Sequence, residues 1–277
     1  MPLSPTVPLR AGTRLPAIGL GTGGLDDATA TRAVATALEG GYRLVDTAES
    51  YRNERGVGEG LRASGVPRDD VLVTTKLTSA WHGRDLARQG LEGCLERLGL
   101  DHVDLLLVHW PNPGQGRYVE AWEGLLGLRE AGLIRAAGVS NFLPAHLERL
   151  QRETGELPEV NQIQLCPTAL RPVEVTFHRA HGIVTQSWSP LGKGAGGLLG
   201  APAVTAAAAR LGVTPGQVVL RWHVQQGICT VPMSRDAGRI AQNLDVFGFD
   251  LSDAELAALD ALDGTGREIL DAEVVFR

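Results

Sequence analysis

The chain has 277 residues, 43% of them hydrophobic and 21% charged, which is an ordinary composition for a globular protein. Its net charge of −6 argues against a nucleic-acid-binding surface, and no apolar run approaches the roughly 20 residues that a membrane span needs. Residues 1–10 lack the apolar core of a signal peptide, and three widely spaced cysteines fit a reducing compartment, so we expect a cytoplasmic protein.

Eight short apolar runs alternate with longer amphipathic stretches, a pattern typical of strand–helix units around a parallel sheet. The runs cover residues 17–21, 43–47, 71–76, 103–110, 136–141, 159–164, 182–188 and 228–232. Helical patterns cover residues 30–41, 84–99, 118–132, 144–155 and 202–212. Eight such units predict an α/β fold, the (β/α)8 TIM barrel, whose chemistry lies at the carboxyl ends of its strands.

Two further segments flank these units. Residues 7–18 predict two short strands around Ala11 and Gly12, a β-hairpin that closes the bottom of the barrel. Residues 251–262, "LSDAELAALDAL", predict a capped amphipathic helix, which an irregular C-terminal tail follows. Because no linker interrupts the pattern, we expect residues 1–277 to form a single domain, and we expect a monomer.

Ionisable residues end three consecutive strands: Asp46, Lys76 and His109. Neighbouring parallel strands lie about 4.8 Å apart, so these side chains should converge in one mouth, within reach of Tyr51 on the loop after the second strand. One such residue alone is more often structural. Three in a row, with a tyrosine nearby, favour a catalytic site.

The four residue types fit one chemistry. A tyrosine with a pKa of about 10 is a poor acid at neutral pH, and a cation beside it lowers that pKa. Lys76 could supply the cation, and Asp46 would keep a buried Lys76 protonated. His109 remains to hydrogen-bond a substrate oxygen. The set therefore predicts a tuned proton donor directed at a carbonyl group.

Several longer motifs contain these residues. They are "VDTAESYRNE" from Val45, "TTKL" from Thr74, "LLLVHWP" from Leu105, "GVSNF" from Gly138, "VNQIQ" from Val160, "SWSPLGKG" from Ser187 and "QNLDVF" from Gln242. Through them the chain resembles the aldo-keto reductases, and among these the bacterial 2,5-diketo-gluconate reductase type, over nearly its whole length. The resemblance implies an NAD(P)H-dependent oxidoreductase that reduces a small aldehyde or ketone, with Asp46, Tyr51, Lys76 and His109 as the catalytic tetrad and Tyr51 as the general acid.

No strand is followed by a Gly-x-Gly-x-x-Gly turn that opens a helix, so a Rossmann site has no support. The resemblance implies instead an extended nicotinamide cofactor across the barrel mouth. Trp188 could face the nicotinamide ring or simply pack in the core. The expected cofactor contacts are Ser140, Asn141, Gln162, Trp188, Ser189, Leu191, Lys193, Ser234, Arg235, Arg239, Gln242 and Asn243.

The end of the eighth strand bears on the choice between NADPH and NADH, because the 2′-phosphate of NADPH needs cations. The family usually has Pro-Lys-Ser where this chain has Pro232, Met233 and Ser234. Arg239 matches the family arginine that meets the phosphate, whereas Arg235 could equally be a solvated residue. We expect NADPH, with NADH as the alternative.

The substrate pocket is expected at Leu25, Trp81, His82 and Trp110. The loop that ends in Leu25 is short and leaves one side of the pocket open. Trp81 and His82 could form the opposite wall, with a solvent-facing His82 as the alternative. Trp110 follows His109, and we also assign it to packing with the other tryptophans.

The chain departs from the family pattern at two positions near the end of the sixth predicted strand. Gln164 and Cys166 stand where the family has a glutamate and a histidine, and the sequence does not show the effect on the pocket. His178 and His181 have the spacing of helical metal ligands but lack a third ligand, so we expect no metal.

Two rival functions stay open. One is a nicotinamide-binding barrel with a regulatory role. The other is a phosphate-handling isomerase, which would need a glutamate base on the sixth strand that we do not find.

Overall fold

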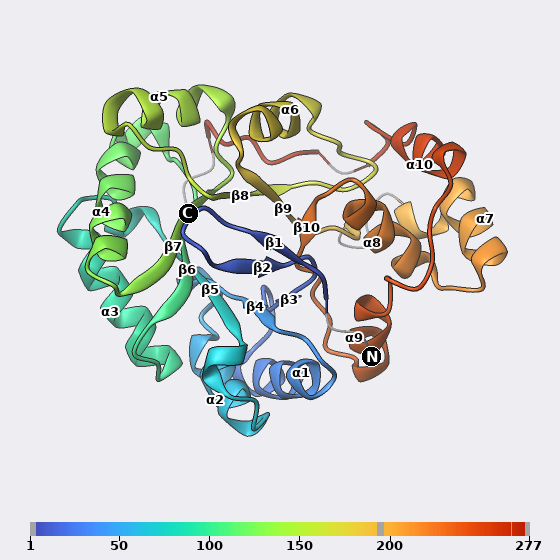
Figure 1. The fold of residues 1–277 in the computed structure, drawn as a ribbon, viewed down its shortest axis with the longest axis horizontal. Helices are drawn as coiled ribbons and strands as arrows, with labels where there is room; N and C mark the ends of the chain where they lie inside the picture. The colour runs from blue at the N-terminus through green and yellow to red at the C-terminus, as the bar shows by residue number, and fades with distance from the viewer. Residues whose placement is uncertain (1–3, 193–196, 267, 275–277) are drawn as a thin grey trace.

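Eight parallel strands form the centre of the computed structural model, which describes residues 4–192, 197–266 and 268–274. They pair in chain order, and the parallel bridges Ile18–Thr230 and Gly21–Met233 join the first strand to the last (Figure 1). The predicted TIM barrel is therefore confirmed. The strands are β3 (Leu20–Gly21), β4 (Leu44–Asp46), β5 (Leu72–Leu77), β6 (Val103–Val108), β7 (Ile134–Ser140), β8 (Val160–Gln164), β9 (Val184–Trp188) and β10 (Cys229–Thr230).

Helices surround the sheet, as Figure 1 shows. They are α1 (Asp27–Glu39), α2 (Glu54–Ala63), α3 (Leu86–Leu98), α4 (Tyr118–Glu130), α5 (Pro144–Thr154), α6 (Pro172–His181), α7 (Pro202–Leu211), α8 (Pro215–Gln225), α9 (Ala237–Leu244) and α10 (Asp253–Asp260). Short 3₁₀ helices are η1 (Glu49–Tyr51), η2 (Arg68–Asp70), η3 (Ser79–Trp81), η4 (Pro113–Gln115) and η6 (Leu198–Gly200). At α10, Ser252 and Glu255 form the capping box that the sequence predicts.

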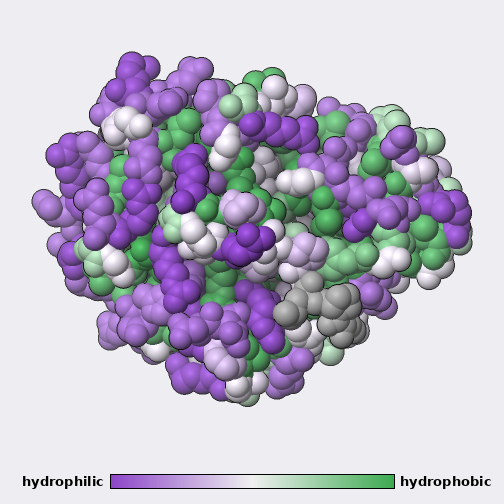
Figure 2. Space-filling view, viewed as in Figure 1, coloured by the Kyte–Doolittle hydropathy of each residue, from purple (hydrophilic) through white to green (hydrophobic). Residues whose placement is uncertain are grey.

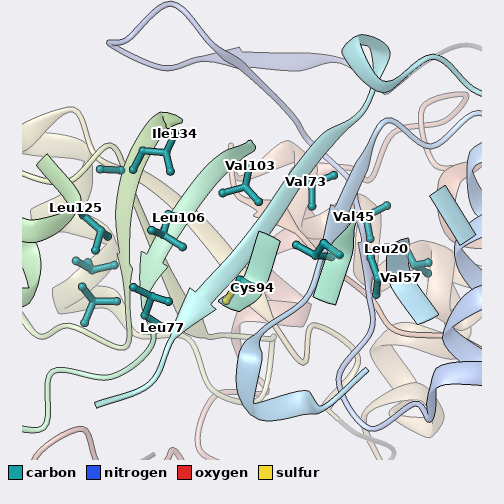
Figure 3. Close-up of a cluster of buried hydrophobic side chains, with 14 of the residues drawn as sticks. Leu20, Val45, Val57, Val73, Leu77, Cys94, Val103, Leu106, Leu125 and Ile134 are labelled. Atoms are coloured by element: carbon teal, nitrogen blue, oxygen red, sulfur yellow. The ribbon is translucent and has the colours of Figure 1, made fainter. Parts of the chain in front are cut away.

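The main hydrophobic core lies between the strands and the helices. Figure 3 shows Val45, Val73 and Leu106 of the strands beside Val57 of α2 and Leu125 of α4. Every residue of β5 and β6 is buried, which explains why neither strand alternates between apolar and polar residues along its length. We propose that residues 1–277 are one domain, because all helices pack around this one sheet.

The amino-terminal hairpin closes the barrel at the start of its strands. Strands β1 (Thr6–Pro8) and β2 (Arg14–Pro16) pair antiparallel, and Figure 1 shows them crossing the barrel opening. Leu15 is fully buried in an interior cluster with Leu44 and Leu72, the first residues of β4 and β5. The predicted hairpin is thus confirmed, and it fills the end of the barrel opposite the strand termini that carry Asp46 and Lys76.

Figure 2 shows the face that carries this hairpin, where hydrophilic residues cover most of the surface and exposed hydrophobic ones form small patches. Among residues 4–192, 197–266 and 268–274, no single helix is long and apolar enough to cross a membrane. Helices α7 and α8 meet that test only as a pair, and they are bent by 95° at the break between them.

The burial of Leu15 predicts a stability effect. Leu15→Ala should lower the free energy of unfolding by about 2–5 kcal/mol, because the barrel interior cannot collapse fully around the missing side chain. Urea unfolding followed by circular dichroism would measure it. Val173→Ala, at an exposed valine of α6, is the control and should change the value by less than about 0.5 kcal/mol. A similar small change for Leu15→Ala would contradict the plugged barrel.

Candidate active site

A buried ion pair joins the ends of β4 and β5. Lys76 Nζ lies 2.7 Å from Asp46 Oδ2 and donates a second hydrogen bond of 2.7 Å to the main-chain oxygen of Thr47. Burial lowers the pKa of Lys76, but the charges of Asp46 and Tyr51 outweigh burial and raise this pKa above its ordinary value. Because the folded pKa is the higher one, the stabilisation that comes from a protonated Lys76 is fully present at neutral pH and is lost as the pH rises through the folded pKa.

Tyr51 lies against this ion pair. Its hydroxyl oxygen is 3.5 Å from Lys76 Nζ, and the ammonium group lies 5.0 Å from the centre of the phenol ring. The ring meets the His109 ring edge to face, with centroids 5.9 Å apart. Ser50 Oγ is 3.4 Å from His109 Nδ1. The four residues that the strand ends predicted therefore converge, and three of them face a common cavity.

Glu49 hydrogen-bonds η1, the short helix that contains Tyr51, to the residues that follow β5. Its carboxylate accepts hydrogen bonds from Thr78 Oγ1 at 2.9 Å and from the Trp81 indole at 2.8 Å. Glu54, just beyond Tyr51, accepts from Thr75 Oγ1 at 2.6 Å. Two carboxylates thus hold the turn on both sides of Tyr51, which fixes the position of its hydroxyl relative to Lys76.

These contacts correct three expectations about the substrate pocket. Trp81 does not line the cavity, because its indole turns toward Glu49 and packs against Gly90 of α3. His82 is neither a wall residue nor solvent-facing: it is buried, and burial, with Arg117 nearby, lowers its pKa to about 4. Leu25 packs in the main core, where its main-chain oxygen accepts from Asn53 Nδ2 at 2.9 Å.

A cavity of about 980 Å³ opens at the carboxyl ends of the strands. Trp110 lines it while remaining 2% exposed, so its side chain both packs and forms part of the cavity wall, and its contact with a substrate stays a prediction. The described lining consists of Gly21, Gly23, Gly24, Asp46, Ser50, Tyr51, His109, Trp110, Ser140, Asn141, Gln162, Trp188, Ser189, Pro190, Leu191, Leu199, Val231, Pro232, Met233, Ser234, Arg239, Asn243 and Leu270.

Amide groups from β7 and β8 gather beside the tetrad. Gln162 Nε2 donates to Asp46 Oδ1 at 2.7 Å, and Ser140 Oγ donates to the main-chain oxygen of Gln162 at 2.8 Å. Asn141, in the left-handed region with a φ of 64°, accepts from the Trp188 indole at 2.9 Å and donates to the main-chain oxygen of His109 at 3.1 Å. Trp188 is therefore oriented by a hydrogen bond that a phenylalanine ring, which has no donor, could not make.

The far end of the cavity meets β10 and α9. Ser234, Arg239 and Asn243 line it, and Met233 is exposed beside them. Arg235 and Gln242 are exposed and lie outside the lining, so their contact with a cofactor stays a prediction. Lys193 lies outside the described residues.

The C-terminal tail supplies a wall that the sequence did not indicate. Leu270 lines the cavity, and Gln164 at the end of β8 holds the segment around it. Gln164 Oε1 accepts from the Leu270 main-chain nitrogen at 3.1 Å, and its Nε2 donates to the main-chain oxygen of Glu268 at 3.3 Å. The departure from the family pattern at Gln164 thus acts as a clamp on the tail.

The described part of the chain contains no group of three or more histidine, cysteine, aspartate or glutamate side chains that could hold a metal ion. His178 is instead a buried structural residue. Its two ring nitrogens lie 2.9 Å from Asn161 Nδ2 and 2.9 Å from Thr185 Oγ1.

The site suits a nicotinamide dinucleotide. Its volume reaches the upper end of the range for ligand pockets, and its amides and serine suit a carboxamide. Arg239 adds a cation for a phosphate. At Gly21, a β-carbon would come within 2.6 Å of the main-chain oxygen of Val231, so glycine there lets the first and last strands of the barrel approach closely.

Comparisons with known proteins agree with this geometry. The model of the "Aldo/keto reductase family" matches residues 17–264. An aldo-keto reductase of Mycolicibacterium vanbaalenii is 48% identical over 94% of this chain and 92% of its own length. The 2,5-diketo-D-gluconic acid reductase B of a Corynebacterium species is 45% identical over 95% of both chains. A Bombyx mori aldo-keto reductase in complex with NADP superposes with a TM-score of 0.89 at 34% identity, over 96% of this chain and 95% of its own.

The Gln164 clamp predicts a local change in dynamics. Gln164→Ala should accelerate amide hydrogen exchange in peptides that contain Leu270 by about fivefold to tenfold, because the amide loses its acceptor. Gln225→Ala is the matched control, since the Gln225 amide also accepts from and donates to the main chain, at Leu251 ahead of α10. That variant should loosen Leu251 and leave Leu270 unchanged. Equal exchange at Leu270 in both variants would contradict the clamp.

Proposed function

The chain belongs to the aldo/keto reductase family, and from this premise we propose that it reduces an aldehyde or ketone to an alcohol with NADPH, using Tyr51 as the general acid. The observation that carries the proposal is the position of the Tyr51 hydroxyl beside the buried Lys76–Asp46 pair. We also propose that the protein acts on small molecules as a cytoplasmic monomer.

Lys76 prepares Tyr51 to donate a proton. The ammonium group lies beside the phenol oxygen and stabilises the phenolate that forms when the proton leaves. Asp46 keeps the ammonium charged, and Gln162 and Lys76 together satisfy both oxygens of Asp46. The pair thus holds one positive charge next to the atom where negative charge develops.

His109 orients the substrate oxygen in this proposal. Its ring is held edge to face against Tyr51 and lies near Ser50 Oγ, so a carbonyl oxygen in the cavity that reaches both the Tyr51 hydroxyl and the His109 imidazole would meet two donors. Trp110, Leu270 and the two glycines before Leu25 contribute apolar lining to the same cavity. This environment suits the uncharged group that a carbonyl presents.

The cofactor would lie along the remaining wall. Gln162, Asn141 and Ser140 would hold the carboxamide, Trp188 the nicotinamide ring, and Ser234 and Arg239 the phosphate of the adenosine half. The nicotinamide, when bound, supplies the hydride that reduces the carbonyl carbon. Arg239 on the cavity wall supports NADPH, although Met233 replaces the lysine that the family usually has.

The proton-donor role predicts the effect of removing one oxygen atom. Tyr51→Phe should slow the NADPH-dependent reduction of a nitrobenzaldehyde about a hundredfold to ten-thousandfold, because the general acid is lost. The phenyl ring keeps its packing against His109, so the dissociation constant for NADPH should stay within about threefold. Tyr118→Phe, at a buried tyrosine of α4, is the control and should retain full activity. Retained activity in Tyr51→Phe would disprove the mechanism, and NADPH binding without turnover of any carbonyl by the wild type would indicate a regulatory role.

The phosphate end predicts the nucleotide preference. By fluorescence titration the wild type should bind NADPH more tightly than NADH, and Met233→Lys should widen this difference about tenfold through a new charge-assisted hydrogen bond. Arg239→Ala should narrow the difference. Arg152→Ala removes the same charge from the exposed face of α5 and should leave the preference unchanged. Equal affinity of the wild type for both nucleotides would overturn the choice of NADPH.

A further inference from the structure

Gln186 lies in the barrel interior and is linked through Gln162 to Asp46, although it takes no direct part in the proposed proton and hydride transfer. It is fully buried on β9, directly opposite Gln162 of β8 in the strand register. Its Oε1 accepts a hydrogen bond of 2.7 Å from Gln162 Nε2. Its own Nε2 is buried without a partner among the described residues. A buried side-chain amide with an unpaired N–H donor costs free energy. The hydrogen bond that Gln186 does make, through its oxygen, therefore calls for an explanation.

The hydrogen bonds of Gln162 explain what the Gln186 oxygen does. A side-chain amide has two N–H donors, and Gln162 uses both: one reaches Asp46 Oδ1 at 2.7 Å and the other reaches Gln186 Oε1 at 2.7 Å. Both partners can only accept at these atoms, so the nitrogen must point toward them. The other polar atom of the Gln162 amide, Oε1, is the acceptor that it can offer to a ligand in the cavity.

A single hydrogen bond to Asp46 would leave the amide plane able to rotate about the Nε2–Oδ1 direction. A second bond in another direction removes that rotation, because two N–H directions define the plane of the group. Gln186 comes from β9 and Asp46 from β4, on the far side of the closed sheet, so the two acceptors hold the amide from different strands. The direction of Gln162 Oε1 is then set before any ligand arrives.

We propose that Gln186 is a positioning residue for cofactor binding: by accepting the second N–H of Gln162, it turns Gln162 Oε1 into a fixed acceptor for the carboxamide N–H of a nicotinamide nucleotide. This inference rests on the proposed function only in the identity of the ligand. It assigns to Gln186 a selectivity for nucleotides whose ring substituent can donate a hydrogen bond.

The test compares NADP⁺ with its 3-acetylpyridine analogue, in which a methyl group replaces the carboxamide NH₂. Isothermal titration gives both dissociation constants without any turnover. The wild type should bind NADP⁺ about fivefold to tenfold more tightly than the analogue. Gln186→Met, which keeps the size but removes the acceptor, should bring this ratio close to one, mainly by weakening NADP⁺.

Two further variants separate positioning from folding. Gln186→Glu keeps a carbonyl acceptor when its buried carboxyl is protonated, so at low pH it should restore most of the wild-type ratio. Gln217→Met removes a comparable buried amide that bonds the main-chain oxygen of Asp245, outside the cavity lining, and should leave the ratio unchanged.

An unchanged ratio in Gln186→Met, or equal losses for both nucleotides, would overturn the inference while leaving the proposed function intact. Failure of the wild type to bind either nucleotide would overturn both.

Discussion

The buried pairing of Lys76 with Asp46 is the interaction on which the site depends. An ammonium group without exposed surface is stable only with a partner, and removing one member of such a pair typically costs about 3–5 kcal/mol. The closed barrel provides that partner, because β4 and β5 are neighbours whose ends present Asp46 and Lys76 to each other. Tyr51, Gln162 and through it Gln186 are all arranged around this one charge pair, so the barrel's closure and its chemistry are coupled.

Features set by short-range patterns were predictable from the sequence. The strands at whose ends Asp46, Lys76 and His109 lie are rich in apolar and β-branched residues, so each ionisable side chain stands out where its apolar run ends. The hairpin around Gly12 and the helix capped by Ser252 depend on local turn and capping chemistry, which a few neighbouring residues determine. The convergence of Asp46, Lys76 and His109 was also predictable, because consecutive strands of a parallel barrel are neighbours and their carboxyl ends lie at the same end of the barrel.

Features that depend on long side chains from distant segments were not predictable. Trp81 and His82 follow β5 closely enough to suggest a pocket wall, but Glu49 captures the Trp81 indole, and His82 is buried. Nothing near Gln164 in the sequence reveals that its amide meets residues 268 and 270, more than a hundred positions away. The pairing of Gln186 with Gln162 depends on the sheet register, which the sequence around Gln186 does not reveal.

The unequal exposure of the tetrad has a consequence for successive turnovers. Lys76 Nζ is enclosed by Asp46, Thr47 and Tyr51, whereas Ser50, next to Tyr51 and near His109, is exposed to solvent. In the proposed reaction, a proton lost from the Tyr51 hydroxyl must therefore be replaced from the cavity side. The alcohol product would leave through the same opening. Reprotonation of Tyr51 and release of the alcohol therefore compete for one route, and a substrate that fills the cavity mouth would slow both steps.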